Sequence, residues 1–186
     1  LHLLSRRQRQ MCIRDRLQNH VLLPEAGNAQ IEKVGGKGKE FWVFGTNYPN
    51  DALPNRPDDA NERGAWRVEV SPAAPATEDC FLNVMQVADN TCKRMHDVKR
   101  IDAEKVVGVQ IADRVVTFSR DSQPLSGKVD MKVDGNAAMK FVITDLIPGT
   151  WQIKKDGKVY IPAMEVRSDD GILSFEGTAG HYEFLR

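Results

Sequence analysis

The chain has 186 residues, of which 41% are hydrophobic and 28% charged, a composition that is neither membrane-like nor disordered. Basic and acidic residues number 26 each, so the formal net charge is zero. No stretch approaches the roughly 18 consecutive apolar residues of a spanning helix, and the opening LHLL is too short for the apolar core of a secretory signal.

Residues 1–16 differ from the rest of the chain. They hold five arginines and one acid, Asp15, and show neither a helical nor a strand period. The string RQRQMCIRDR resembles a translated sequencing-adapter remnant, so we expect a non-native leader, with a basic arm as the alternative. Because the chain begins with Leu1 rather than Met, we also expect a fragment. Without residues 1–16, 21 basic and 25 acidic residues remain, and a net charge of −4 argues against a nucleic-acid partner.

From Leu17 onward the pattern predicts strands. NHVLLP predicts a short strand closed by Pro24, and QIEKVGG predicts a second that stops at a glycine pair. EFWVFG, aromatic and β-branched, predicts a third strand bounded by Gly38 and Gly45. Residues 46–64 contain three prolines and little apolar content, which predicts a long loop that is either functional or mobile.

Two further strands follow this loop. AWRVEVSP has a period of two that places Trp66, Val68 and Val70 on one face. In CFLNVMQVAD the period does not separate helix from strand, but the valine and phenylalanine content favours a strand. The apolar residues that this segment can bury are Phe81, Val84 or Met85, and Val87.

Cys80 and Cys92 lie at the two ends of an apolar run. Twelve positions apart, they could form a disulfide in an exported protein. Two reduced cysteines are the favoured interpretation, because the sequence has no CxxC and no Cys/His metal spacing.

The second half of the chain predicts hairpins and meanders. Residues 105–111 and 114–119 predict the arms of a hairpin that turns at Ala112 and Asp113, with a possible bulge at Gly108. GKVDMKVDG predicts a strand with three apolar residues on one face, namely Val129, Met131 and Val133. The firmest turns are the two Asp-Gly pairs, Asp134 with Gly135 and Asp156 with Gly157.

About a dozen short strands separated by turn residues predict an all-β fold, an antiparallel β-sandwich. No segment predicts a convincing helix, and residues 97–106 are the best candidate. We expect a main sandwich part over residues 17–121 and a C-terminal antiparallel meander over residues 122–186, packed together as one unit.

The sequence contains no convincing catalytic constellation. VGGKGKEFW departs from the phosphate-binding loop, because Glu40 follows Lys39 and a strand follows instead of a helix. His20, His96 and His181 lack the spacing of metal ligands, so we expect no metal and no cofactor. His96 beside Asp97 predicts a solvated turn. The carboxylate pairs, Asp58 with Asp59 and Asp169 with Asp170, are neighbours in loops rather than groups that converge across a cleft.

Aromatic side chains are the remaining candidates for ligand contact. Trp42 and Trp66 lie in predicted strands whose alternation favours a place in the core. Tyr48 lies in the proline-rich loop, where an exposed ring could stack on a ligand. Structural and ligand-binding roles for Tyr48 both stay open.

Three stretches carry a resemblance to a known family. HVLLPEAGNAQIEKVGGKGKEFWVFGTNYP and GAWRVEVSPAAPATEDCFLNVMQVAD resemble the C-terminal β-rich part of heparinase II/III-like polysaccharide lyases. The closing FVITDLIPGTWQIKKDGK and GILSFEGTAGHYEFL resemble the way such chains end. The likeness covers residues 17–186 as a general texture rather than as one diagnostic motif.

The resemblance implies an α/α toroid before the β-sandwich, and β-elimination at a uronic acid. In that family a Tyr or His takes the proton at C5, and Asn or His groups offset the carboxylate charge. These residues lie in the toroid and in the opening strands of the β-part. Because this chain has no toroid, we expect it to be inactive alone and assign no catalytic residue. His20 and Tyr48 are the candidate substrate-binding residues.

Two hypotheses follow. In the first, the chain supports a missing N-terminal helical domain and contacts an acidic polysaccharide through the parent enzyme, periplasmic or secreted. In the second, it is a free-standing carbohydrate-binding or adhesion module with Tyr48 at the ligand face. The first predicts an exposed apolar patch where the helical domain docks, and the second a fully polar surface. Neither involves nucleic acid or a membrane.

Overall fold

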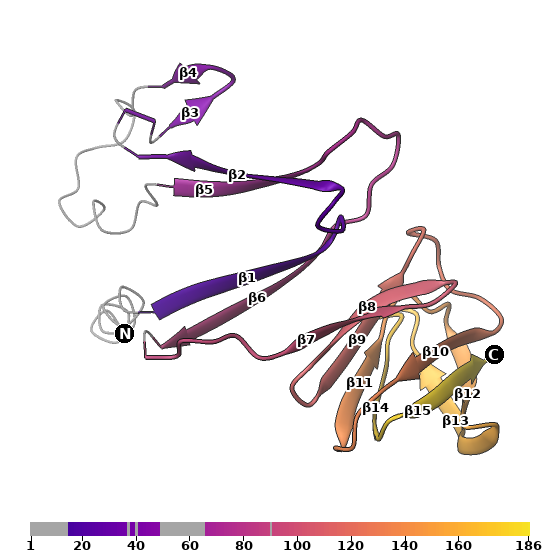
Figure 1. The fold of residues 1–186 in the computed structure, drawn as a ribbon. Helices are drawn as coiled ribbons and strands as arrows, with labels where there is room; N and C mark the ends of the chain where they lie inside the picture. Colours follow the sequence, from indigo (N-terminus) through magenta and orange to yellow (C-terminus); the bar gives the residue numbers. More distant parts are fainter. Residues whose placement is uncertain (1–14, 37, 40, 49–65, 90) are drawn as a thin grey trace, which may run out of the picture. The chain divides into compact units, whose positions relative to one another are not determined.

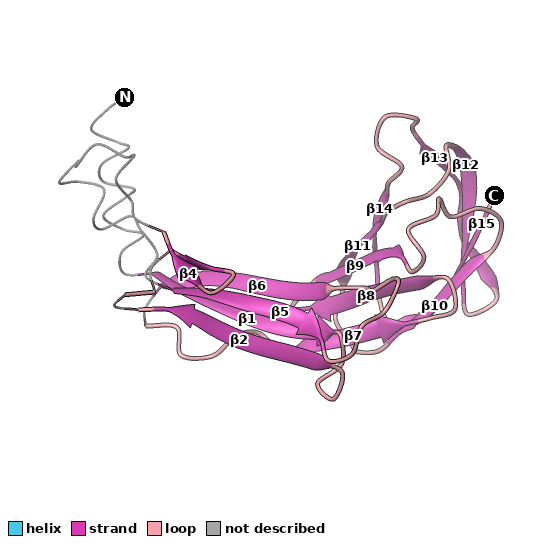
Figure 2. Ribbon diagram, turned by 90° about the horizontal axis from the view of Figure 1, so that it is seen from above, coloured by secondary structure: helices cyan, strands magenta, loops and turns pink. Residues whose placement is uncertain are grey.

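The computed structural model describes residues 15–36, 38–39, 41–48, 66–89 and 91–186 (Figure 1). All regular secondary structure in these residues is β-strand, as the colouring in Figure 2 shows. The all-β fold class is therefore confirmed. The chain divides into two compact units, Leu1–Lys93 and Arg94–Arg186. The expected division at residue 121 falls inside the second unit, and of the expected leader only Asp15 and Arg16 are described, where they open the first strand.

The described part of the first unit consists of antiparallel two-stranded ribbons. In the first ribbon, β1 (Asp15–Leu23) pairs with β6 (Leu82–Asp89). In the second, β2 (Ala29–Gly35) pairs with β5 (Trp66–Pro72). The third is a short hairpin of β3 (Trp42–Val43) and β4 (Thr46–Asn47).

The expectation of one strand over EFWVFG is wrong, because the chain reverses inside it. Phe44 and Gly45 both have positive φ, 47° and 84°, as the two central residues of a tight hairpin turn require. Gly45 adopts this conformation without steric cost. The remaining residues of the expected loop, from 49 to 64, lie outside the described residues.

The strand β6 is confirmed, but its apolar residues are not buried as expected. Leu82 and the alternate positions after it face the more covered side, whereas Met85 and Val87 lie on the exposed side. Phe81 is also exposed. A strand alternates its side chains between two faces, so burying Leu82 and Val84 places the odd-numbered residues on the other face.

The second unit is a β-sandwich, whose two sheets face each other in Figure 1. One sheet has the order β14-β11-β9-β8-β7 and the other β10-β15-β12-β13. The bounds of the first sheet's strands are β7 (Val98–Asp102), β8 (Val106–Ile111), β9 (Arg114–Ser119), β11 (Met139–Ile143) and β14 (Leu173–Gly177). Those of the second sheet are β10 (Val129–Val133), β12 (Gly149–Lys155), β13 (Lys158–Val166) and β15 (Gly180–Leu185). All pairs are antiparallel except β9 with β11, which run parallel.

The core lies between these two sheets. β10 buries Val129, Met131 and Val133, as its period of two predicts. The largest fully buried side chains include Trp151 and Tyr182, and both satisfy their polar atoms. Trp151 Nε1 donates to the carbonyl of Ile147 at 3.0 Å, and Tyr182 Oη donates to the carbonyl of Thr178 at 2.6 Å.

The core also contains a group of packed aromatic rings. Phe141 stacks on Phe175 with ring centroids 4.8 Å apart, and Tyr182 packs against Phe141 at 4.7 Å. These rings come from β11, β14 and β15, so the cluster joins both sheets. Aromatic pairs of this kind add about 0.5–1.5 kcal/mol each beyond the burial of their surface.

Two predicted hairpins are confirmed and one predicted bulge is not. β8 and β9 meet at Ala112 and Asp113, and β12 and β13 meet at Asp156 and Gly157. Asp134 and Gly135 instead lie on the connection between the two sheets. Gly108 causes no bulge, because the β8–β9 register is continuous. A Cβ at Gly108 would lie 2.2 Å from the carbonyl oxygen of Val116, so close backbone approach explains this glycine.

The weak helix candidate at residues 97–106 is a strand, β7, followed by the start of β8. β7 pairs along its whole length with β8 and buries Ile101. Sheet pairing therefore overrides the local propensity of this charged segment.

Candidate functional site

His20 and Tyr48, the two predicted substrate-binding residues, lie on different ribbons of the first unit. His20 is on β1 directly opposite Val84 of β6, and its side chain is exposed. Tyr48 follows β4 immediately, and its side chain is 54% exposed. The prediction that both bind substrate stays a prediction.

Tyr48 belongs to a face of the β3–β4 hairpin. Its backbone N–H donates to the carbonyl of Phe41 at 3.2 Å, which extends the ladder by one pair beyond Trp42 and Asn47. Phe41 and Tyr48 are thus directly opposite. Because side chains alternate between faces, they share a face with Val43 and Thr46, and all four are exposed.

The other face of the hairpin carries Trp42 and Asn47, which are half-buried. Lys39 Nζ lies 5.1 Å from the centre of the Trp42 ring, within the range of a cation–π interaction. Asn47 Oδ1 accepts from the backbone N–H of Phe41 at 2.8 Å and braces the base of the hairpin. Trp42 is therefore only partly in a core, and the side chain of Trp66 lies outside the described residues.

A depression of about 400 Å³ lies in the second unit beside residues 119–126. Lys105 reaches across it, and its Nζ donates to the carbonyl of Lys128 at 2.9 Å. Arg120 pairs with Asp102 and donates to the carbonyl of Ala103. The cations that line this depression are thus held by groups of the protein itself.

Asp121, at the same depression, is fixed by its own loop. The backbone N–H of Gln123 and the hydroxyl of Ser119 both donate to Asp121 Oδ1, at 3.0 and 2.9 Å. These bonds favour the ionised carboxylate and hold the pKa of Asp121 below its usual value. A carboxylate with a lowered pKa is a poor general base near neutral pH, so Asp121 stabilises the loop.

A second depression, of about 300 Å³, contains His96 and Asp97. Both side chains are exposed, as expected for a solvated turn. Gln110 lines the same depression, but its amide Nε2 donates to the carbonyl of Asp134 at 2.8 Å. This hydrogen bond connects β8 to the loop after β10.

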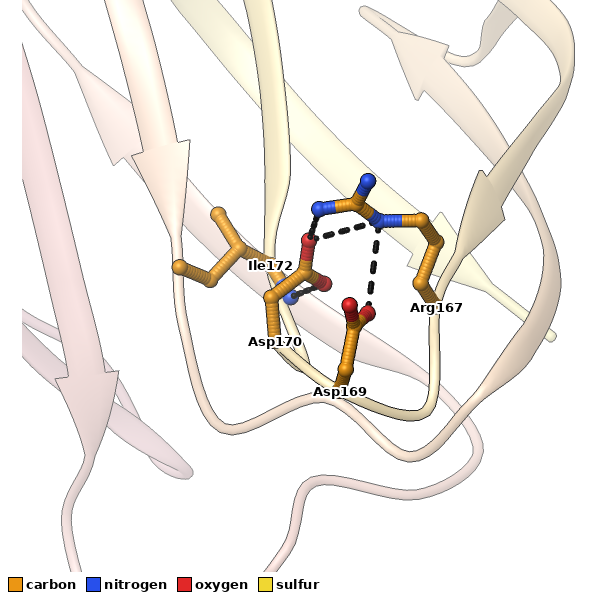
Figure 3. Close-up of polar contacts among 4 residues, drawn as sticks. All are labelled: Arg167, Asp169, Asp170 and Ile172. Atoms are coloured by element: carbon orange, nitrogen blue, oxygen red, sulfur yellow. Dashed lines mark hydrogen bonds and ion pairs between the residues drawn. The ribbon is translucent and has the colours of Figure 1, made fainter.

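The adjacent carboxylates Asp169 and Asp170 form an ion-pair cluster with Arg167 (Figure 3). Arg167 Nη2 and Nε lie 2.5 and 3.0 Å from Asp170 Oδ2, and the N–H of Ile172 donates to Asp170 Oδ1 at 3.1 Å. Arg167, and then the Ile172 N–H, lower the pKa of Asp170. The cluster closes the turn between β13 and β14, which supports the prediction that this carboxylate pair is a loop feature.

Among the residues with a described position, no three His, Cys, Asp or Glu side chains gather as metal ligands would. Within the same residues, no helix is long and apolar enough to cross a membrane. Within the described residues, no disulfide joins Cys80 and Cys92, and the Gln86 amide lies 3.7 Å from Cys92 Sγ.

Residues 100–186 match the family model of the heparinase II C-terminal domain. This region is a C-terminal heparinase II/III-like domain. The match begins inside β7 and includes every later strand, so it covers nearly all of the sandwich. No curated protein matches the chain.

In the heparinase II C-terminal domain, the polar clusters described above brace loops and strand ends. The exposed face that carries Phe41 and Tyr48 lies outside this domain, on the β3–β4 hairpin. Of the residues on this hairpin, sequence reasoning identified only Tyr48 as a candidate for ligand contact. Phe41, Val43 and Phe44 were missed because EFWVFG was treated as one strand. The glycine directly after Phe44 is the signal that could have predicted the turn.

Proposed function

We propose that this chain is the non-catalytic, β-rich C-terminal portion of a polysaccharide lyase. The parent enzyme cleaves uronic-acid-containing polysaccharides by β-elimination, and this portion supports its helical catalytic domain. The observation that carries the proposal is the match of residues 100–186 to the heparinase II C-terminal domain. Export to the periplasm or beyond belongs to the same proposal.

A second observation supports a docked domain. On the β1–β6 ribbon, Leu17 lies opposite Val87, and Met85 lies two residues along on the same face. These apolar side chains are 62%, 69% and 65% exposed. The opposite face, which is more covered, carries Gln18 and Gln86.

The distribution of polarity is thus inverted at the Leu17 end of the ribbon, whereas toward the other end Leu82 and Val84 lie on the more covered face. Gln18 Oε1 is buried without a hydrogen-bond partner, while the neighbouring apolar side chains contact solvent. Both features cost free energy in an isolated ribbon. An apolar surface of a helical domain, placed over Leu17, Met85 and Val87, would remove the second cost.

The test compares this chain with a longer protein expressed from the coding region upstream. β-Elimination leaves a C4–C5 double bond, whose ultraviolet absorbance reports turnover on a polyuronate. We expect turnover by the longer protein and none by the 186 residues alone. Efficient cleavage by this chain, or an upstream region without a helical domain, would contradict the proposal.

A pair of charge substitutions tests the docking face. In the longer protein, Met85→Lys with Val87→Lys should lower the melting temperature and the turnover, because two ammonium groups would be buried at the domain contact. Val159→Lys is the matched control, since Val159 is similarly exposed but lies on β13 of the sandwich. Equal effects of the two sets would exclude the proposed docking face.

A free-standing carbohydrate-binding module is the second candidate, favoured by the exposed aromatic face of the β3–β4 hairpin. It would bind glycans without any other domain. It also requires the β1–β6 face to stay exposed in the mature protein, so a longer protein in which Met85 and Val87 become protected from solvent would exclude it.

A further inference from the structure

We propose that the β3–β4 hairpin is a stacking platform for the sugar rings of an acidic polysaccharide, with Phe41, Phe44 and Tyr48 as the contacting side chains. This inference rests on the proposed function for its class of substrate. It assigns a ligand-contacting role to a specific element outside the heparinase II C-terminal domain.

The first argument is the geometry of the hairpin. Phe41 and Tyr48 lie directly opposite on one face, joined through the backbone bond from Tyr48 N to Phe41 O. Side chains at opposed positions of an antiparallel pair have Cβ atoms about 5 Å apart, so the two aromatic side chains start from neighbouring positions on this face. Val43 and Thr46 continue the same face toward the turn. The result is an apolar surface with one phenolic hydroxyl.

The second argument is the conformation of Phe44. Its φ of 47° is in the left-handed region, which costs a residue with a Cβ roughly 1–2 kcal/mol. Asn or Gly at this position would suit the turn better. The Phe44 side chain is 100% exposed, so no packing within the described chain offsets this cost. A contact outside the chain supplies a physical reason for an aromatic ring here.

The third argument is local charge. Residues 33–48 contain three lysines and one glutamate, whereas the whole chain is balanced. Lys39 is placed on the hairpin by its contact with the Trp42 ring, on the face opposite Phe41 and Tyr48, so its charge acts on a bound polyanion through the local field rather than through direct contact. A locally positive element with aromatic side chains attracts a polyanion and raises its local concentration. Uronate carboxylates supply that negative charge.

The size of the element favours a sugar chain over a protein partner. Pyranose rings present flat C–H faces that pack on aromatic rings, and two or three rings suffice to hold a few sugar units. A stable protein–protein contact typically buries about 800 Å² on each partner, which is more surface than one hairpin of this length is expected to supply. A protein occupant is therefore an outcome that the experiment must detect.

The experiment measures the affinity of the full 186-residue chain for polygalacturonate by calorimetry, with a neutral glucan as the comparison polymer. We expect Phe44→Ala and Tyr48→Ala each to weaken polygalacturonate binding about five- to ten-fold. Phe118→Ala is the matched control, since Phe118 is a partly exposed aromatic residue on β9, and it should bind as the unchanged chain does. Lys39→Gln should weaken binding of polygalacturonate at low salt but not of the glucan.

Phe44→Asn keeps the experiment decisive if an alanine variant folds poorly. Asn tolerates positive φ, so this variant should be at least as stable as the unchanged chain while it loses the ring. We expect its melting temperature to hold or rise and its affinity to fall. An affinity equal to that of the unchanged chain would overturn the proposal.

Two other results would also overturn it: no measurable binding of polygalacturonate, or a loss of self-association in Phe44→Asn with polysaccharide affinity unchanged. The second would make the hairpin a protein contact.

The outcome of this experiment is separable from that of the test of the proposed function. If the longer protein cleaves polyuronate but the hairpin variants bind normally, only the platform fails. If the hairpin variants lose affinity but the longer protein has no turnover, only the lyase assignment fails.

Discussion

The two units of this chain use the same alternation of apolar and polar residues with different results. In the second unit, apolar faces of two sheets meet and bury residues such as Trp151 and Phe141 completely. In the described part of the first unit, Val34 and Leu82 are the buried hydrophobic residues, and the other hydrophobic residues of the core all lie in the second unit.

The difference shows what a period of two specifies. It determines that a strand forms and which side chains share a face, but another layer must cover that face before burial stabilises it. β10 and β6 both alternate, yet only β10 lies in a four-stranded sheet with a second sheet across the core. β6 is half of a two-stranded ribbon.

The largest expected effect separates the units themselves. Residues 94–186, expressed alone, should show a cooperative thermal transition, because they contain the complete aromatic and aliphatic core. Residues 17–93 alone should show none, since isolated two-stranded ribbons are marginally stable in water. Circular dichroism against temperature checks both. A cooperative transition in residues 17–93 would break the comparison.

Next in size is the loss of a core side chain. Trp151→Ala should destabilise the chain by about 3–5 kcal/mol, because it removes a fully buried indole and leaves a cavity. Met85→Ala should change the free energy of unfolding by less than about 0.5 kcal/mol, as an exposed position does. Urea denaturation measures both. Similar losses in the two variants would mean that the β1–β6 ribbon is as well packed as the sandwich.

A smaller effect is expected from adding one methyl group inside the sandwich. Gly108→Ala places a Cβ within 3 Å of backbone and side-chain atoms of β9, and should cost about 1–3 kcal/mol. Gly27→Ala, in the first unit, meets nothing within 4 Å and should be nearly neutral. The difference in urea midpoint between the two variants is the measurement. A neutral Gly108→Ala would show that β8 and β9 can separate without cost.

The smallest effect concerns pH. Burial, and then the neighbouring Tyr160, raise the pKa of Tyr182 to about 12, above its ordinary value near 10. The folded state therefore holds this proton longer than the unfolded chain. The contribution of this proton to the free energy of unfolding is complete below pH 10. It is lost as the pH rises from about 10 to 12, by at most about 1.4 kcal/mol per pH unit.

Tyr182→Phe removes that titration and should flatten the dependence of the urea midpoint on pH in this window. Tyr160→Phe is the control, because Tyr160 is partly exposed and should leave most of the slope in place. An unchanged slope in Tyr182→Phe would assign the alkaline loss of stability to other groups.

Much of the sandwich could be predicted from sequence. The turn at Asp156 and Gly157 and the arms on either side of Ala112 and Asp113 follow from short-range chemistry, since these turns need few residues and particular backbone angles. The candidate site was predicted less well. Tyr48 was identified, but its partners Phe41 and Phe44 depended on a reversal of the chain within a six-residue apolar segment.

By itself, the sequence determined the all-β class, most strand positions and the faces on which side chains such as Val129 and Met131 lie, because these depend on local backbone geometry and a period of two. Only the tertiary structure decided which faces are covered, why residue 108 must be glycine, and that Phe41 and Tyr48 are neighbours. Each of these depends on which strands pair and in what register, and pairing joins residues that are distant in the chain.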